Sequence, residues 1–335
     1  MTVKITIIGL GQIGASIGLA LATHKSQVTT TGYDQAAEVS RKAAKMGAVD
    51  KVVHNLSVSV KGSQAVILAL PVNQIRETLE SIARDLDAGT VVMDTAPVKA
   101  AVAAWMEKLL PPQCHYVGLT PALNPLVLEE TRTGIDAARA DLFQQGRVAV
   151  IASPSANDEA VNLAVSLVTL LGAQPYFAEL AEVDGMMAAI HLLPGLAAAA
   201  LVETVTGQPA WTDIRKLAGI PFVAAMRPLD VDEPGALTEA ALQNRVNSVR
   251  VLDEYLAALK SLRDDIDRDD KKNVNKRLGR AWEGRAKWRQ TRAEGDWQSG
   301  EMGRQEIPDF GDVLSRQFGG LGKRLSRRDK RPDAD

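Results

Sequence analysis

The sequence predicts an α/β protein: an N-terminal doubly wound, mostly parallel sheet, then an all-helical domain and a charged tail. Three observations predict this. Short apolar runs alternate with amphipathic segments through the first 177 residues, the pattern is helical only from Leu180, and charge and glycine dominate from Lys276. Strand–helix alternation is typical of a parallel sheet with helices on both faces. The expected domains are 1–177, 178–275 and 276–335.

Seven apolar runs of the first domain have the length and side-chain bulk of strands. In chain order they are 3–9, 27–34, 65–70, 90–94, 115–119, 147–152 and a weaker run at 174–179. Helices are expected between them at 13–22, 36–46, 72–86 and 157–171, and in the second domain at 180–205, 211–218 and 236–266. A chain of 335 residues with 46% hydrophobic composition is long enough to bury two cores.

Composition excludes several classes of protein. The formal net charge of −2 argues against a nucleic-acid-binding protein. A single cysteine, Cys114, excludes a disulfide framework and a cysteine-rich zinc site, so we expect a cytoplasmic protein without a metal centre. The apolar stretch 185–202 is long enough to span a membrane, but it contains His191 and Pro194. We therefore expect a buried helix of a soluble protein there, and no membrane association.

A glycine motif follows the first predicted strand and opens a helix. It reads Gly9-Leu10-Gly11-Gln12-Ile13-Gly14. In such a turn the first glycine allows the tight bend, the second lets the backbone approach a pyrophosphate, and the third lets helix pack on strand. The free N–H groups of the helix N-terminus favour phosphate. The motif predicts a Rossmann-type dinucleotide site that uses Gly9, Gly11, Gln12, Ile13 and Gly14.

The second predicted strand ends at an acidic residue, Asp34, twenty residues after the motif. A carboxylate at this place accepts hydrogen bonds from the ribose hydroxyls and repels a 2′-phosphate, so the predicted cofactor is NAD rather than NADP. Further cofactor contacts are expected where later strands end, because a doubly wound sheet binds its ligand at that edge. These contacts are Leu70, Pro71 and Asp94.

The chain resembles the prephenate/arogenate dehydrogenases of tyrosine biosynthesis from Val3 to about Asp267. The resemblance is carried by the segments GLGQIGASIG, TGYDQ, ALPVNQIRETL, MDTAPVKA, YVGLTPALNP, GRVAVIASPSAN and ELAEVDGMMAAIHLLPGLAAAALVE. It implies a Rossmann domain, a helical domain that forms a homodimer, and a small carboxylate substrate at their junction. It also implies NAD-dependent oxidation of a ring hydroxyl with loss of CO2.

Carried over residue by residue, the resemblance matches the cofactor motif but departs at the catalytic positions. Gly9, Gly11, Gly14, Ser16 and Asp34 match the motif, and Asp94 and Lys99 match the segment after the fourth strand. The family's serine in that segment is Pro97 here. Its histidine after the fifth strand is Thr120, and its three histidines in the helical domain are Val183, Leu192 and Gly195.

Thr120 is the most consequential departure. Removal of a hydride from an alcohol needs an acceptor for the hydroxyl proton, and histidine is suited to that role near pH 7. A threonine hydroxyl can hold a hydrogen bond but does not take the proton. We expect Thr120 to bind the reacting hydroxyl, His191 to act as an auxiliary base and Arg227 to bind a substrate carboxylate.

Three functions stay open from the sequence. The first is the family reaction with altered or impaired chemistry. The second is a dehydrogenase of another small hydroxy acid, and the third is a non-catalytic, NAD-binding regulatory protein, since fold alone does not decide function. The tail 276–335 carries fifteen Lys and Arg against ten Asp and Glu. We expect it to be flexible, with docking to an acidic partner as the alternative.

Overall fold

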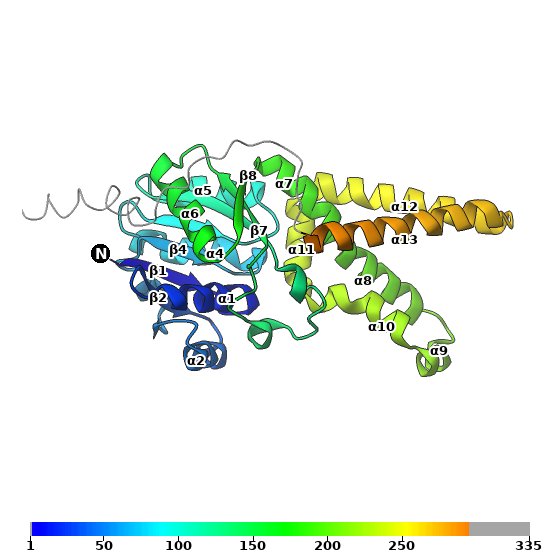
Figure 1. Cartoon of the computed structure of the whole chain (residues 1–335), viewed down its shortest axis with the longest axis horizontal. Helices are drawn as coiled ribbons and strands as arrows, with labels where there is room; N and C mark the ends of the chain where they lie inside the picture. The colour runs from blue at the N-terminus through cyan, green and yellow to red at the C-terminus, as the bar shows by residue number, and fades with distance from the viewer. Residues whose placement is uncertain (1, 295–335) are drawn as a thin grey trace, which may run out of the picture.

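The protein consists of a sheet domain and an elongated helical domain beside it (Figure 1). The computed structural model describes residues 2–294. Eight strands form one sheet in the order β3-β2-β1-β4-β5-β6-β7-β8. The strands are β1 (Val3–Ile8), β2 (Val28–Tyr33), β3 (Lys51–Val52), β4 (Ala65–Leu68), β5 (Val91–Asp94), β6 (His115–Ala122), β7 (Arg147–Ala152) and β8 (Gln174–Phe177).

The order 3-2-1-4-5-6 of the first six strands is that of a dinucleotide-binding sheet. These strands are parallel, and β8 is parallel to β7. Between β6 and β7 the pairing is antiparallel, with Thr120 opposite Ala149. A parallel pair needs a crossover of a dozen or more residues, most often a helix, and the segment between these strands has only two short 3₁₀ turns. The predicted doubly wound sheet is confirmed, with an antiparallel step at β7.

Helices cover both faces of the sheet and enclose two apolar layers. The helices of the domain are α1 (Gln12–Leu21), α2 (Ala37–Met46), α3 (Leu56–Ser59), α4 (Val72–Ile82), α5 (Ala100–Leu109) and α6 (Asp158–Leu170). One layer includes Ile5, Ile7 and side chains of α1 and α6. The other includes Ile8, Leu68 and side chains of α4 and α5. Successive residues of β1 thus point to opposite faces, both buried, as expected for a central strand.

The second domain contains helices only. They are α7 (Leu180–Met187), α8 (Leu193–Thr206), α9 (Trp211–Leu217), α10 (Ile220–Met226), α11 (Pro234–Gln243), α12 (Arg245–Asp267) and α13 (Lys271–Glu294). A π-helical segment, Ala188–Leu192, joins α7 to α8. Ala188 and Leu192 are buried in the same apolar cluster as Val98 and Tyr116 of the sheet domain. This shared cluster fixes the start of the helical domain against the sheet.

The helix expected over 236–266 is divided at Asn244. The backbone of Asn244 leaves the helical region, and its side-chain amide donates to the carbonyl oxygen of Asp184 at 2.7 Å. Asparagine favours such breaks because its side chain competes with the backbone for hydrogen bonds. The result is two helices, α11 and α12, that pack around the start of the helical domain.

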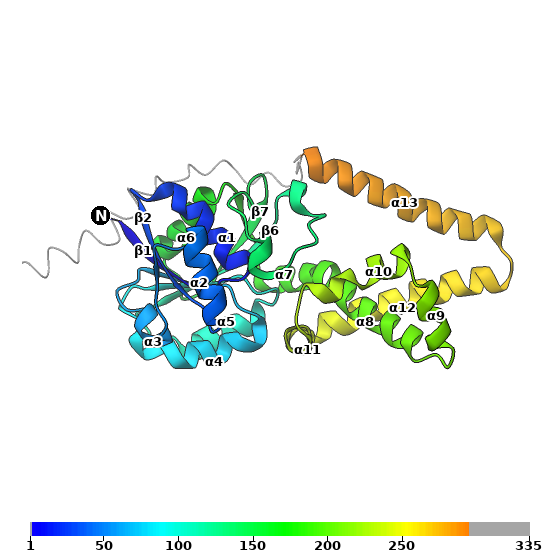
Figure 2. The same ribbon diagram turned by 90° about the horizontal axis from the view of Figure 1, so that it is seen from below.

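The predicted domain boundary at residue 276 falls inside a long helix. Helix α13 runs from Lys271 to Glu294, antiparallel to α12, and returns to the sheet domain (Figure 2). Residues 276–294 are therefore helical rather than a tail. The rest of the expected tail, 295–335, which includes Trp297, lies outside the described residues.

One helical segment of the described chain, Leu180–Thr206, is long and apolar enough to cross a membrane by length and composition alone. This is weak evidence for a membrane protein, because core helices of soluble proteins meet the same criterion. Only 22% of its most apolar window is buried within one chain. The expectation of a buried helix is therefore not met inside a single subunit.

Candidate nucleotide site and active site

The turn after β1 has a shape that only glycine permits at two positions. Gly9 has a φ of +88°, in the left-handed region, and a Cβ there would lie 2.4 Å from the carbonyl oxygen of Ala69. A Cβ on Gly14 would lie 1.8 Å from the carbonyl oxygen of Gly9. The first turn of α1 therefore rests directly on the bend that follows β1.

Gly11 differs from these two glycines, since a Cβ there would meet no protein atom within 4 Å. It is the N-cap of α1 and faces open space, with no side chain capping the helix. The first N–H groups of an α-helix have no partner within the helix, and Gln12 and Ile13 belong to this first turn. An open cradle at a helix N-terminus fits a pyrophosphate group.

Asp34 lies just beyond β2 and connects the turn after β1 to the turn after β2. Its Oδ2 accepts the N–H of Leu10 at 2.8 Å, and its Oδ1 accepts the N–H of Ala36 at 2.8 Å. The carboxylate is half-buried. Each carboxylate oxygen has a second lone pair, so both can still accept a ribose hydroxyl. These residues therefore fit the sugar of NAD as well as its pyrophosphate.

The segment after β4 borders the same turn. Leu70 is half-buried, and a Cβ on Gly9 would meet its Cδ2 at 2.9 Å. Pro71 is also half-buried and precedes α4, which begins at Val72. Leu70 and Pro71 thus border the glycine turn, and their contact with a dinucleotide stays a prediction.

The structure corrects the prediction that Asp94 contacts the cofactor. Its side chain is fully buried at the end of β5 and has protein partners on both oxygens. Oδ1 accepts Lys99 Nζ at 2.7 Å and the N–H of Ala96 at 2.8 Å, and Oδ2 accepts the hydroxyl of Tyr116 at 2.7 Å. A side chain enclosed in this way cannot reach a ligand. Asp94 therefore has a structural role below the surface of the site.

Asp184 of α7 connects this buried network to the helical domain. Its carboxylate accepts the backbone N–H groups of Lys99 at 2.6 Å and Ala100 at 3.1 Å, at the N-terminus of α5. A carboxylate there satisfies free N–H groups and interacts favourably with the helix dipole. One domain therefore caps a helix of the other, which fixes α7 over the end of β5.

Burial dominates the electrostatics of this network. Loss of hydration lowers the pKa of Lys99, although the neighbouring carboxylate of Asp94 opposes the shift. Burial also raises the pKa of Tyr116, with Asp94 adding to the effect. The pKa of Asp184 is raised by burial, against the two backbone N–H groups that stabilise its charged form. We interpret the network as structural, because Lys99 and Tyr116 are fully buried.

Thr120 lies near the carboxyl end of β6, at the junction of the two domains. It pairs with Ala149 of β7, and the side chain of Ala149 packs against Val183 of α7. Directly paired residues of antiparallel strands point to the same face, so the side chain of Thr120 is turned toward α7. Its Oγ1 is buried without a hydrogen-bond partner in the described part of the chain. Buried hydroxyls are rarely left unsatisfied, so Thr120 Oγ1 has the capacity to hydrogen-bond a ligand at this junction.

His191 contacts a different element from the one expected. Asp184, His191 and Gly195 are separated by seven and four residues, a spacing that would place them on one face of a regular helix. The π-helical segment contains His191 and changes that spacing, so Asp184 contacts the start of α5 and Gly195 lies against Leu237 of α11. His191 Nε2 lies 2.8 Å from a carboxylate oxygen of Asp232.

Arg227 reaches from the helical domain to the loop after β6. It begins the 3₁₀ segment Arg227–Asp230, and its Nη2 donates to the carbonyl oxygen of Glu130 at 2.9 Å. The guanidinium is exposed and has five N–H donors, so one such bond leaves capacity for a carboxylate. Each of Thr120, His191 and Arg227 lies on an element near the domain junction, but no hydrogen bond or ion pair within residues 2–294 joins any two of them. No group of three or more possible metal ligands occurs within residues 2–294.

The fold and the site together define the class: a dinucleotide-binding oxidoreductase with a separate helical domain. Residues 17–177 match the model of the prephenate dehydrogenase nucleotide-binding domain, and residues 180–280 match that of the prephenate dehydrogenase dimerization domain. The chain belongs to the prephenate dehydrogenase family. The first match begins after Gly14, so the glycine turn is independent evidence for the cofactor site.

Relatives and solved structures agree with this assignment. The chain is 25% identical to prephenate dehydrogenase of Bacillus subtilis, over 81% of this chain and 72% of that protein. It is 27% identical to cyclohexadienyl dehydrogenase of Zymomonas mobilis, over 79% of this chain and 89% of that protein. Arogenate dehydrogenase of Synechocystis superposes with a TM-score of 0.65 at 25% identity, covering 85% and 99% of the two chains.

Prephenate dehydrogenase of A. aeolicus, solved with hydroxyphenyl propionate and NAD+, shares the fold with a TM-score of 0.73 at 21% identity. That alignment covers 86% of this chain and 98% of the other. The family's nucleotide-binding domain and this neighbour support NAD as the cofactor. The dimerization domain supports a homodimer.

Sequence reasoning did not select Tyr116 or Asp184 as site residues. Tyr116 is one apolar residue among others in a strand, and nothing local to it predicts a buried partner. Asp184 precedes a long apolar helix, where an acidic residue is usually solvated. The available clue was Lys99, a lysine between apolar residues just after a strand, five residues from Asp94. A buried lysine needs a carboxylate partner, and Asp94 was the nearest.

We predict that Asp34→Ala raises the dissociation constant of NAD+ about 10- to 100-fold, since hydrogen bonds from two hydroxyls to a carboxylate are lost. The affinity for NADP+ should stay the same or improve, because the charge that repels a 2′-phosphate is removed. Titration of both cofactors by calorimetry measures this. Glu38→Ala, an exposed carboxylate in the first turn of α2, is the matched control. Equal losses for the two cofactors would mean that Asp34 serves only to brace the turns.

Proposed function

We propose that this protein is an NAD-dependent dehydrogenase that oxidises the ring hydroxyl of prephenate or arogenate with loss of CO2. The observation that carries the proposal is the buried, unpartnered Oγ1 of Thr120 at the domain junction. Family membership and the fit of the nucleotide site to NAD add to it. NAD, when bound, supplies the hydride acceptor.

Thr120 has one role in this proposal, which is to orient the reacting hydroxyl by a hydrogen bond. Its own hydroxyl is too weakly basic to take the proton. The proton leaves the ring oxygen as the carbonyl forms, and the phenol oxygen of the product regains one once the carboxylate has left as CO2. The reaction therefore has no net proton loss, and a site that holds the proton temporarily is sufficient.

His191 and Arg227 take the other roles. We infer that His191 holds the proton, because it is the histidine of the π-helical segment at the junction of the two domains and its Nε2 lies 2.8 Å from a carboxylate oxygen of Asp232. Arg227 binds a substrate carboxylate, because its exposed guanidinium keeps N–H donors beyond the one that contacts Glu130. Its contact with the carbonyl oxygen of Glu130 fixes it beside the loop that follows Thr120.

The direct test is formation of NADH, followed by absorbance, with prephenate and with arogenate as alternative substrates. Turnover of either substrate supports the proposal and identifies the side chain that the site accepts. If NAD+ raises the melting temperature while neither compound is oxidised, the site binds the cofactor but the proposed reaction is wrong.

We predict that Thr120→His raises kcat for the substrate of this enzyme about 10²- to 10⁴-fold, since a general base typically contributes that much. The variant would place an imidazole on the carboxyl end of β6, facing α7. The measurement is the kcat of both proteins over a range of pH, where the variant should gain a dependence on a group titrating near neutrality. Thr133→His, in the loop after β6, is the control. A fall in kcat for Thr120→His would show that the native proton path uses another residue.

A second candidate is a dehydrogenase of another small hydroxy acid, and one specific observation favours it. Thr120 stands where the family mechanism uses a base, so the pocket has changed at its reacting centre. A thermal-shift screen of hydroxy acids in the presence of NAD+ separates the two candidates. A non-catalytic, NAD-binding regulatory protein is the interpretation left if no compound shifts the melting temperature.

We also propose that the protein acts as a cytoplasmic homodimer. Its single cysteine, Cys114, is buried and free, as is usual in a reducing compartment. Most of the apolar helix Leu180–Thr206 is not buried within one chain, and a second subunit would cover it. Light scattering at micromolar concentration measures the state, and a monomer would contradict the proposal.

A further inference from the structure

Helix α13 extends beyond the dimerization domain of the family, whose match ends at residue 280. Near its start, Arg277 pairs with the buried carboxylate of Asp265 on α12. At its far end, Arg289 Nη2 lies 2.7 Å from Glu129 Oε1, and Arg292 Nη2 donates to the carbonyl oxygen of Leu123. The helix is therefore attached to both domains of its own chain. The middle of α13 lies between these attachments.

One face of α13 carries its large apolar side chains. With 3.6 residues per turn, Leu278, Trp282 and Trp288 lie on the same side of the helix as Arg289 and Arg292. The two arginines contact the sheet domain, so this side is turned toward the body of the molecule. Arg292 is buried, but Trp282 is 66% exposed, Trp288 is 54% exposed and Leu278 is 42% exposed. The apolar side chains on this inner side of α13 are therefore not buried by other residues of the same chain.

The opposite side of α13 is strongly basic. It carries Lys272, Lys276, Arg280 and Lys287. Cations on the outer side of a helix are ordinary solvated groups. An acidic partner bound on this outer side would leave the tryptophans uncovered, although the tryptophan side also carries Arg285 and the two arginines that contact the sheet domain. The tryptophan side needs an apolar partner.

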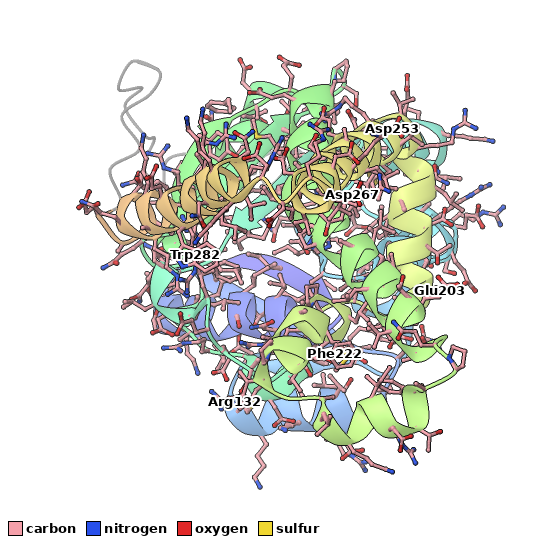
Figure 3. All side chains as sticks on the ribbon, turned by 90° about the vertical axis from the view of Figure 1, so that its right-hand side faces the viewer. Arg132, Glu203, Phe222, Asp253, Asp267 and Trp282 are labelled. Carbon is pink, nitrogen blue, oxygen red and sulfur yellow. The ribbon has the colours of Figure 1, made fainter. Side chains whose placement is uncertain are left out.

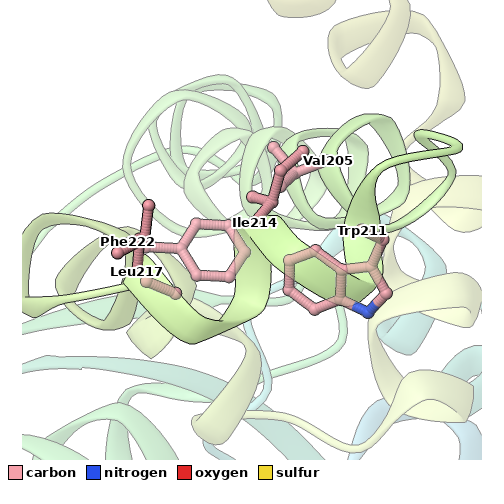
Figure 4. A pocket seen from close by; sticks show the side chains of 6 residues that line it. Val205, Trp211, Ile214, Leu217 and Phe222 are labelled. Atoms are coloured by element: carbon pink, nitrogen blue, oxygen red, sulfur yellow. The ribbon is translucent and has the colours of Figure 1, made fainter.

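Neighbouring helices leave apolar surface uncovered in the same region. On α12 the exposed residues Val249, Leu256, Leu259 and Ile266 fall within one stripe. An apolar hollow of about 270 Å³ lies among α8, α9 and α10, lined by Val205, Trp211, Ile214, Leu217, Ala218 and Phe222 (Figure 4). Figure 3 looks onto this end of the molecule, with Trp282 of α13 above Phe222 of α10. Large exposed apolar patches are typical of interaction sites.

We propose that the tryptophan side of α13 is part of the interface between two copies of this chain, so that the helix closes over the partner subunit. The occupant is a second copy because α12 and the first half of α13 belong to the family's dimerization domain, and the tryptophan face continues it. In a two-fold interface the same patch occurs twice, so both tryptophans of each copy become buried. Aromatic residues in buried pockets dominate the energy of such interfaces.

The consequence for the site follows from the far end of α13. Arg289 and Arg292 hold the segment from Leu123 to Glu129, which begins three residues after Thr120. A partner that covers the middle of α13 would fix both ends of the helix. Dimer formation and the position of the loop after β6 are thus linked by one rigid element.

The test uses the full chain and a double variant, Trp282→Ala with Trp288→Ala. The dimer dissociation constant, measured by sedimentation equilibrium, should rise at least about 100-fold, since each buried tryptophan is a typical hot spot. The matched control is Lys276→Ala with Lys287→Ala on the basic side, which should leave the constant unchanged. The milder pair Trp282→Phe with Trp288→Phe should retain most of the affinity.

Tryptophan fluorescence of the wild-type protein gives a second test that does not depend on whether the variants fold. On dilution from dimer to monomer, the tryptophan emission should shift to longer wavelength as Trp282 and Trp288 become exposed. An unchanged dissociation constant in the alanine variant overturns the proposal. A second result would also overturn it. In that result a poly-glutamate peptide binds the wild type but not the Lys276→Ala, Lys287→Ala variant, and the tryptophan emission does not change on dilution. That result would assign α13 to an acidic partner instead.

Discussion

Replacing Lys99 with methionine should lower the free energy of unfolding by about 3–5 kcal/mol, the usual cost of leaving one partner of a buried ion pair. Lys99 and Asp94 are both 0% exposed, and their side chains are 2.7 Å apart. Methionine fills a similar volume but offers no charge, so Asp94 would stay buried with only the hydroxyl of Tyr116 and the N–H of Ala96. Urea denaturation followed by circular dichroism measures the change.

The double variant Lys99→Met with Asp94→Asn is the informative comparison. Asparagine keeps an acceptor for Tyr116 while removing the uncompensated charge, so much of the lost stability should return. Lys108→Met, an exposed lysine on the same helix, should change stability by less than about 0.5 kcal/mol. If the single and double variants are equally unstable, charge compensation is not what Lys99 contributes, and its packing under Gly118 is the remaining explanation.

The strands and the cofactor turn could be predicted from the sequence because their information is local. Val3–Ile8 is a mostly apolar run that is followed at once by Gly9, and this pattern specifies a buried central strand and its bend without knowledge of the rest of the chain. The short strand Lys51–Val52 was missed because two residues carry no periodicity. The antiparallel direction of β7 could have been inferred from the absence of a helix before it.

The domain junction could not be predicted in the same way, since it depends on contacts between distant segments. Asp184 is 85 residues from Lys99, whose N–H it caps, and no local pattern links the two. The π-helical segment around His191 changes which residues share a helix face. A face assigned from the sequence assumes the regular spacing of an α-helix, so it could not foresee this change. Most of helix α13 was assigned to the tail because its composition is highly charged, although its large apolar side chains gather on one side of the helix.

Two glycines of the cofactor turn should lose stability to very different extents when the same methyl group is added. Gly14→Ala places a Cβ 1.8 Å from a backbone oxygen that cannot move aside cheaply, so we expect a loss of about 3 kcal/mol or more in unfolding free energy. Gly11→Ala adds the methyl group to open space at an N-cap with a φ of −67°, and should cost no more than about 1 kcal/mol.

The affinity for NAD+ should separate these two variants further. In Gly11→Ala the methyl group occupies the place where a pyrophosphate approaches the start of α1, so two charge-assisted hydrogen bonds are lost and the dissociation constant should rise at least about 100-fold. Calorimetric titration of a variant that melts near the wild-type temperature measures this loss without interference from unfolding. Gly279→Ala, a glycine of α13 with no neighbour within 4 Å of the added atom, should leave NAD+ binding unchanged. If Gly11→Ala binds NAD+ as the wild type does, the dinucleotide does not lie on the N-terminus of α1. The open space at Gly11 would then have no role in the reaction, because the other glycines of the turn are explained by backbone packing alone.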